Sequence, residues 1–174
     1  MIRLFLDIVA HRKGPQDVPA DGSVLARALA AYLVFGAASL WPSMSGIGVL
    51  ARYVALDVGL VVLVFGGVLA AARRLDRVPQ TLAALFGTGA LLSAASLPFV
   101  WLAAGATAEA GNPGGDTAVL VAAMALLVLL LASLLVTGHI LRHALDWPYP
   151  AGVLGAVMYF ALTLALFRRL FPVT

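Results

Sequence analysis

The chain has 174 residues, of which 63% are hydrophobic and only 11% charged, and its mean hydropathy is +1.04. A soluble domain carries about a quarter charged residues, so this composition excludes an ordinary water-soluble domain and indicates an integral membrane protein. The net charge of +3 comes from short basic clusters beside apolar runs, which indicate membrane topology and no nucleic-acid partner, and the absence of cysteine excludes disulfides and thiolate metal sites.

The first 23 residues are predicted to form a cytoplasmic amphipathic helix and a loop. In MIRLFLDIVAHR, the polar residues Arg3, Asp7 and His11 share one helical face, and apolar side chains cover the rest. We expect this helix to lie in the membrane interface with its apolar side towards lipid and an Arg3–Asp7 pair towards water. The segment HRKGPQDVPADGS contains two prolines and two glycines, which is typical of a loop.

Residues 24–174 are predicted to form a single all-α transmembrane domain. Crossing the hydrocarbon core takes about 20 apolar residues in a helix, and the chain contains several runs of about that length. We expect five spanning helices, with 104–117 as the longest interior loop, at residues 24–41, 49–72, 80–103, 118–141 and 151–167.

The distribution of Lys and Arg predicts a cytoplasmic N-terminus and a C-terminus on the far side of the membrane. Usage rich in Ala, Leu, Arg and Gly is typical of a GC-rich bacterium, so we expect the inner membrane, with the C-terminus in the periplasm. Eight basic residues then lie inside and three outside. The inner residues are Arg3, Arg12, Lys13, Arg27, Arg73, Arg74, Arg77 and Arg142, and the outer ones are Arg52, Arg168 and Arg169.

Asp57 is the first candidate for a functional residue, because a carboxylate inside a span is costly unless it is paired, protonated or in a water-filled cavity. It lies roughly 12 Å along the second span. Tyr53 stands one turn earlier on the same face and can donate a hydrogen bond, and Arg168 or Arg169 can approach from the same leaflet. The pattern fits either a structural interhelical pair or a proton or ion site.

The segment GHILRHALDWP at 138–148 is the densest polar patch. His139 and His143 have the i, i+4 spacing of metal ligands, but no third ligand is in view. Arg142 and Asp146 have the same spacing and are expected to pair. A haem held by two histidines would need one on another span, and the only other histidine is His11. We expect a helix end at the cytoplasmic headgroups with no metal or cofactor, while a cofactor protein or membrane enzyme using this face stays open.

Small residues form a narrow face on the third span, where Gly89 and Ser93 are followed by Ser96. The second span carries Gly66 and Gly67, and the fifth begins AGVLGA. Small faces let membrane helices approach closely. We expect tight packing within the chain or against a partner, with a substrate path along the hydroxyls of the third span as the alternative.

No catalytic residues can be assigned. The sequence lacks GxSxG, an HExxH motif and a pair of carboxylates at acid–base spacing on one helix. The Gly-x-Gly in GTGALL has neither a preceding strand nor a phosphate-binding lysine. We therefore expect a protein that is not an enzyme.

In its predicted topology, the chain resembles small bacterial membrane proteins similar to the Yip1 family. The resemblance rests on LFLDIVAHRKGPQDVPA before the first span, the basic turn with QTLAALFGTGALL at the third, and GHILRHALDWP after the fourth. It covers most of the chain, although the long acidic N-terminal region of eukaryotic Yip1 proteins is missing. The resemblance implies membrane organisation or partner binding and no catalytic residues.

Three functions are left in competition, the third being the membrane enzyme or cofactor protein at His139, Arg142 and His143. The leading one is an accessory or scaffold subunit that binds another membrane protein through its small-residue faces, and a homo-oligomer is the other assembly that we expect. The alternative is a small oligomeric transporter or channel that uses Asp57 and the polar face of the third span.

Overall fold

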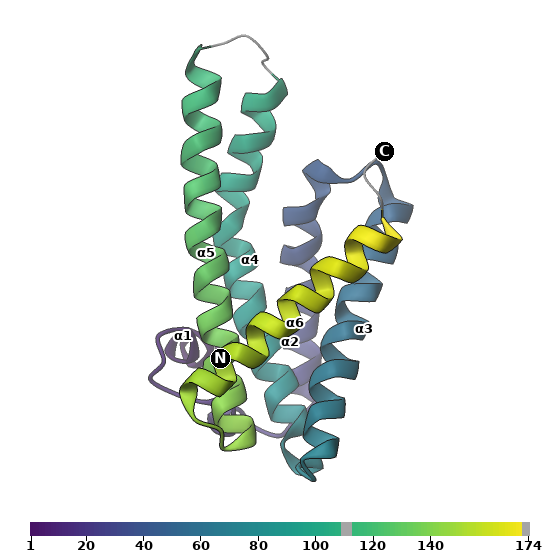
Figure 1. Ribbon diagram of the computed structural model, residues 1–174, viewed down its shortest axis with the longest axis vertical. Helices are drawn as coiled ribbons and strands as arrows, with labels where there is room; N and C mark the ends of the chain where they lie inside the picture. The colour runs from purple at the N-terminus through teal and green to yellow at the C-terminus, as the bar shows by residue number, and fades with distance from the viewer. Residues whose placement is uncertain (109–112, 172–174) are drawn as a thin grey trace.

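The computed structural model describes residues 1–108 and 113–171, and in them it contains six α-helices and no strand (Figure 1). Five helices are long and apolar enough to cross a membrane. The all-α fold with five spans and a short N-terminal helix is therefore confirmed, and the protein is an integral membrane protein. The helices are α1 (Ile2–Val9), α2 (Gly22–Leu40), α3 (Ile47–Ala71), α4 (Val78–Ala108), α5 (Pro113–Leu145) and α6 (Tyr149–Leu170).

Helix α4 is the centre of the bundle, since it packs against α1, α2, α3 and α5, while α6 packs on α5 and α3. The first half of α4 is buried almost all round, and this half includes the polar residues Thr81 and Thr88. Apolar surface gains nothing by leaving lipid, so a central position in a membrane bundle depends on close packing and polar contacts instead. The helix that carries the most small and hydroxyl residues is accordingly the one that the others surround.

The α4–α5 hairpin is longer than the sequence predicts. With 31 and 33 residues, the two helices measure about 46 and 50 Å, against about 30 Å of hydrocarbon. Figure 1 shows that the excess rises beyond the ends of α2, α3 and α6. The predicted loop at 104–117 was therefore wrong for most of its length: α4 runs to Ala108 and α5 starts at Pro113, while 109–112 lie outside the described residues.

The physical reason is that a polar segment can stay helical in water when its residues favour a helix. The segment after Trp101 is rich in alanine, the strongest helix former. Proline is favoured in the first turn of a helix, as at Pro113, and an acidic residue there, Asp116, favours the positive end of the helix dipole.

The N-terminal helix packs against the protein. Phe5 and Ile8 are buried against the bundle, while Ile2 and Leu6 stay exposed on its outer side. Gly87 of α4 makes room for this contact, because a Cβ there would overlap the ring of Phe5. The prediction that the whole apolar side faces lipid was therefore wrong for Phe5 and Ile8.

The predicted Arg3–Asp7 pair is also absent among the described ion pairs. Asp7 lies 3.8 Å from Lys13 instead, because the chain turns back after α1. His11 ends this helix in a left-handed conformation with φ of +58°, which brings the loop onto the same side as Asp7.

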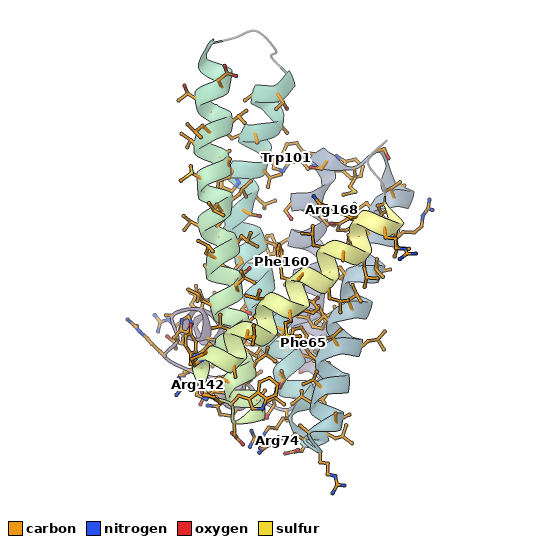
Figure 2. All side chains as sticks on the ribbon, in the orientation of Figure 1. Phe65, Arg74, Trp101, Arg142, Phe160 and Arg168 are labelled. Carbon is orange, nitrogen blue, oxygen red and sulfur yellow. The ribbon has the colours of Figure 1, made fainter. Side chains whose placement is uncertain are left out.

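Charged side chains gather at the two ends of the bundle (Figure 2). Arg74 and Arg142 lie at one end, near α1, and Arg168 lies towards the other. Phe65 and Phe160 stand between these ends. The α3–α4 turn and the C-terminal end of α5 were predicted to lie at the same end of the bundle. They do, since Arg77 of this turn donates to backbone carbonyls at the end of α5.

Candidate functional site

Asp57 is hydrogen-bonded to Tyr32, a partner that the sequence did not indicate. The Tyr32 hydroxyl on α2 donates to Oδ2 of Asp57 on α3 at 2.6 Å. In the described residues no Arg, Lys or His nitrogen lies within 4.0 Å of the Asp57 carboxylate. A half-buried carboxylate about 15 Å along α3 therefore has a neutral donor and no cation beside it.

The partners expected for Asp57 make no recorded hydrogen bond or ion pair with it in the described residues, although Tyr53 lines a cavity together with it. The ring of Tyr53 packs on Phe167 of α6 with 3.9 Å between centroids, and its hydroxyl makes no recorded hydrogen bond with the carboxylate among the described residues. Arg168 and Arg169 are exposed at the end of α6. Both expectations were wrong, because Phe167 holds Tyr53 in an aromatic cluster and water attracts the guanidinium groups.

A cavity of about 300 Å³ lies between the five spanning helices, and we call it the central cavity. Every one of these helices contributes at least one polar side chain to its wall. Apolar side chains complete the lining, among them Val61, Leu85, Leu92 and Val136. The polar residues are Tyr32, Asp57, Thr88, Ser93, Ser133, Thr137, Tyr159 and Thr163.

Three of the hydroxyl groups in this wall already donate their proton within the protein. Thr88 donates its proton to the carbonyl of Ala84 at 2.8 Å, and Ser133 donates to Leu130 at 2.7 Å. Tyr32 donates to Asp57, which as a carboxylate can only accept. The oxygen lone pairs that remain are available to a donor in the cavity.

Thr163 of α6 adds a buried hydroxyl one turn after Tyr159. Buried polar groups in proteins are nearly always paired with protein or water. The Tyr159 hydroxyl stands close to that of Thr163 in the cavity wall and is a partner within the protein.

Two further cavities continue from the central one towards the end of the bundle that holds the α2–α3 loop. An outer cavity of about 200 Å³ shares Tyr32, Asp57 and Ser93 with the central cavity. A third, of about 520 Å³, shares Ser39 and Leu40 with the outer one. The Asp57–Tyr32 pair thus stands where the first two cavities meet.

Gly89 and Ser93, predicted as a small face of the third span, belong to this site. A Cβ on Gly89 would lie 2.7 Å from the ring of Tyr32, so the glycine allows Tyr32 to cross α4 and reach Asp57. Ser93 lies one turn further and lines both cavities. The small face therefore serves the site as well as helix packing.

All three histidines meet at the other end of the bundle. The His11 ring contacts that of His139 with centroids 4.5 Å apart, and His139 contacts His143 at 4.6 Å. Nε2 of His139 lies 2.9 Å from the carbonyl of Lys13, and Nε2 of His11 lies 3.3 Å from that of Leu135. Since a carbonyl can only accept, both nitrogens carry protons, and these bonds join the N-terminal segment to α5.

This histidine cluster is not arranged as a cofactor site. The rings touch edge to face, which leaves no room for a haem between them. In residues 1–108 and 113–171, no three side chains of His, Asp or Glu are placed to hold a metal ion. His11 was the histidine that the sequence could not place, because only tertiary packing brings it to α5.

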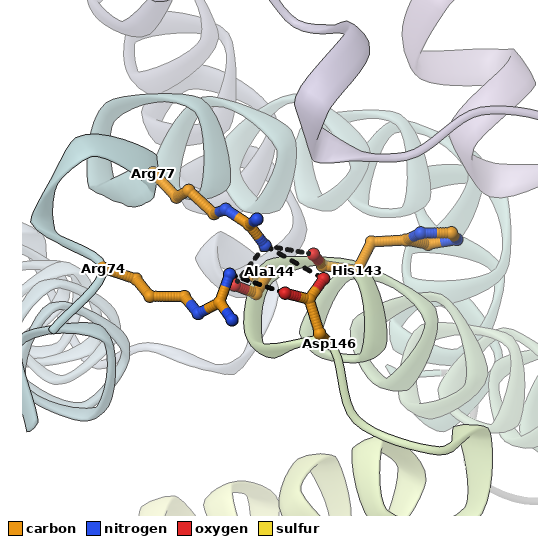
Figure 3. A network of polar contacts seen from close by, with 5 residues as sticks. All are labelled: Arg74, Arg77, His143, Ala144 and Asp146. Atoms are coloured by element: carbon orange, nitrogen blue, oxygen red, sulfur yellow. Dashed lines mark hydrogen bonds and ion pairs between the residues drawn. The ribbon is translucent and has the colours of Figure 1, made fainter. Parts of the chain in front are cut away.

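Asp146 is the centre of the remaining polar cluster (Figure 3). It pairs with Arg74 and with Arg77, whose Nη1 lies 3.1 Å from Oδ1. Arg77 also donates to the carbonyls of His143 and Ala144 and so caps the end of α5. The hydrogen bond from Arg77 and the charge of both arginines hold the pKa of Asp146 below its usual value, although burial opposes them.

The predicted Arg142–Asp146 pair was therefore wrong. Helix α5 ends at Leu145, and Asp146 adopts a left-handed conformation with φ of +55°. The i, i+4 spacing applies only inside a helix, so Asp146 turns towards the α3–α4 turn while Arg142 stays exposed.

Sequence reasoning missed five polar residues of the central cavity: Tyr32, Ser133, Thr137, Tyr159 and Thr163. Each is a polar side chain within an apolar span, which is the pattern that marked Asp57. Their hydroxyls carry no charge, so the cost of placing them in lipid is small and the pattern is correspondingly weak.

Comparison with known proteins places the chain in no family, because no protein-family model, curated protein or solved structure matches it. The resemblance to Yip1 proteins stays a prediction.

Proposed function

We propose that this protein is a non-enzymatic membrane protein that binds a small polar solute in the central cavity and passes it to the outer side, as a small transporter or channel. The observation that supports this best is the Asp57–Tyr32 pair at the junction of the central and outer cavities. A carboxylate without a cationic partner inside a span is typical of a substrate or ion pathway.

We also propose an orientation for the protein and the membrane in which it lies. The N-terminus lies in the cytoplasm of a bacterium and the outer cavity faces the periplasm, in keeping with the excess of Lys and Arg at the α1 end. Five helices enclose little volume, so a homo-oligomer is the assembly that we expect for a complete pathway.

Cysteine substitution tests this proposal directly, because the natural chain has no cysteine. Single variants Ser93→Cys and Thr137→Cys place a thiol in the cavity wall, and Leu131→Cys places one on the exposed apolar face of α5 as a matched control. Sided membrane vesicles are treated with a charged, impermeant thiol reagent, and the labelled fraction is measured.

We expect the two cavity thiols to react from the periplasmic side and the control thiol not to react. If Ser93→Cys and Thr137→Cys are as inert as Leu131→Cys in folded protein, water does not reach the cavity and the proposal fails. Reaction only from the cytoplasmic side would overturn the orientation while leaving the pathway in place.

A second candidate is the accessory subunit. It is supported by the large apolar side chains that α4 and α5 leave exposed, among them Trp101, Leu120 and Met124. Purification in mild detergent followed by mass spectrometry tests this role. A stoichiometric partner that is lost from a Leu120→Gln, Met124→Gln variant would support it, and a chain that purifies without a partner would contradict it.

A further inference from the structure

We propose that the solute of the central cavity is a small organic ammonium ion. This inference rests on the proposed function, and it concerns the charge and chemistry of the occupant. It follows from three properties of the wall: an acidic group without a cation, two hydroxyls that can only accept a hydrogen bond, and two pairs of aromatic rings.

The first property is charge. Asp57 is the only charged residue among those that line the central cavity, and its single recorded donor in the described structure is the neutral Tyr32 hydroxyl. Negative charge in a low-dielectric site is stabilised by an opposite charge at close range. A cation in the cavity gains this interaction, whereas an anion is repelled.

The second property is hydrogen bonding. The hydroxyls of Thr88 and Ser133 donate to backbone carbonyls of their own helices. In the cavity wall their oxygens can therefore only accept a hydrogen bond. An ammonium group has three N–H donors and no acceptor. Its three N–H groups can donate to Asp57 and to these two hydroxyls.

The third property is the aromatic lining. Tyr32 pairs with Phe86 at 5.3 Å between centroids, and Phe65 pairs with Tyr159 at 4.7 Å. The first pair joins α2 to α4 and the second joins α3 to α6, and all four residues line the cavity. Aromatic faces attract cations and also accommodate the apolar part of an organic molecule, which favours an organic cation over a metal ion.

The test compares three probes of similar shape: n-butylammonium, 1-butanol and butyrate. Thermal unfolding of the purified chain in detergent is followed over a concentration series of each probe at neutral pH. A ligand that binds only the folded state raises the melting temperature in a saturable manner. We expect this for n-butylammonium alone.

Variants then locate the binding site. Asp57→Asn should weaken n-butylammonium binding by about tenfold or more, because a charge-assisted hydrogen bond is lost. Ser133→Ala should weaken it by a smaller factor. Asp116→Asn removes an exposed acidic group on the hairpin and should leave the affinity unchanged.

The outcomes separate this inference from the proposed function. Equal stabilisation by 1-butanol, or stabilisation by butyrate or by K⁺ and not by n-butylammonium, overturns the ammonium assignment even when the cavity thiols react with aqueous reagent. An n-butylammonium effect that survives in folded Asp57→Asn protein overturns the site. The three probes are compared on the natural chain, so misfolding of a variant cannot leave the assignment undecided.

Discussion

On one side of the bundle, α5 and α6 approach one another at glycines and α4 receives the ring of Phe5 at another, while the glycines of α3 on the other side face open space. A Cβ on Gly152 would overlap the carbonyl oxygen of Gly138, and one on Gly87 would overlap Phe5. Cβ atoms on Gly66 and Gly67 of α3 would meet nothing within 4 Å. The same residue type thus makes close contact in one region and none in the other.

This difference coincides with the position of the site. Close packing around α4 gives a rigid frame that holds Tyr32, Thr88 and Ser133, while α3, which brings Asp57, makes fewer backbone contacts with its neighbours. A cavity persists where α3 packs loosely against α4. We infer that the tight region fixes the site and that α3 is the helix freest to move around a solute.

The largest effect is expected for Gly152→Ala. The added methyl group overlaps the backbone of α5, which cannot move aside as a side chain can, so the free energy of unfolding should fall by about 3 kcal/mol. Gly66→Ala is the matched change in the open region and should be neutral or slightly stabilising. Thermal unfolding in one detergent compares the two, and equal effects would refute the contrast between the regions.

A smaller effect is expected for Gly87→Ala, because its methyl group meets the ring of Phe5, which can rotate away. We expect a loss of about 1–2 kcal/mol and a partly released α1. Release is measured by thiol labelling of an Ile8→Cys reporter, since Ile8 is fully buried in the docked helix. Gly59→Ala, which meets nothing within 4 Å, is the control, and slow labelling in both variants would show that α1 does not depend on this contact.

The residues that terminate α3 and α5 offer a second comparison between the two regions. Arg73 and Asp146 both terminate helices in the left-handed conformation, with φ of +57° and +55°. Arg73 has no recorded side-chain partner in the described residues, so Arg73→Gly should stabilise the protein by about 1 kcal/mol. Asp146→Gly relieves the same strain but loses Arg74 and Arg77, so it should gain less or lose stability. Thermal unfolding of the two variants measures these changes in stability. An equal gain in stability in both would show that the pairs of Asp146 with the two arginines contribute nothing.

The smallest effect is expected from pH. Because the pKa of Asp146 is lowered in the folded protein, its contribution is fully present above the ordinary carboxyl pKa of about 3.9. It is lost as the pH falls through the lowered value. The melting temperature of the natural chain should therefore drop more steeply below about pH 4 than that of Asp146→Asn. Parallel curves for the two proteins would contradict this role for Asp146.

The site was only partly predictable from sequence. The cost of a carboxylate in lipid singled out Asp57, and small residues singled out Gly89 and Ser93. Tyr32 stayed hidden because nothing in a linear sequence relates it to Asp57, which lies 25 residues further on. For the same reason the expected partners of Asp146 and Asp57 were wrong, since neighbours one turn apart in sequence were displaced by partners from other helices.

The sequence by itself determined the membrane fold, the number of spans and the approximate place of each, because about 20 consecutive apolar residues have no stable alternative to a spanning helix. It did not determine where the α4–α5 hairpin ends, since helix propensity and turn residues compete in a polar segment. Only the tertiary structure decided which helix is central, that His11 meets His139, and that a polar cavity opens beside Asp57. Those features depend on how the helices cross. The hydropathy pattern carries no information on helix crossing, because lipid and the surface of a neighbouring helix are equally apolar.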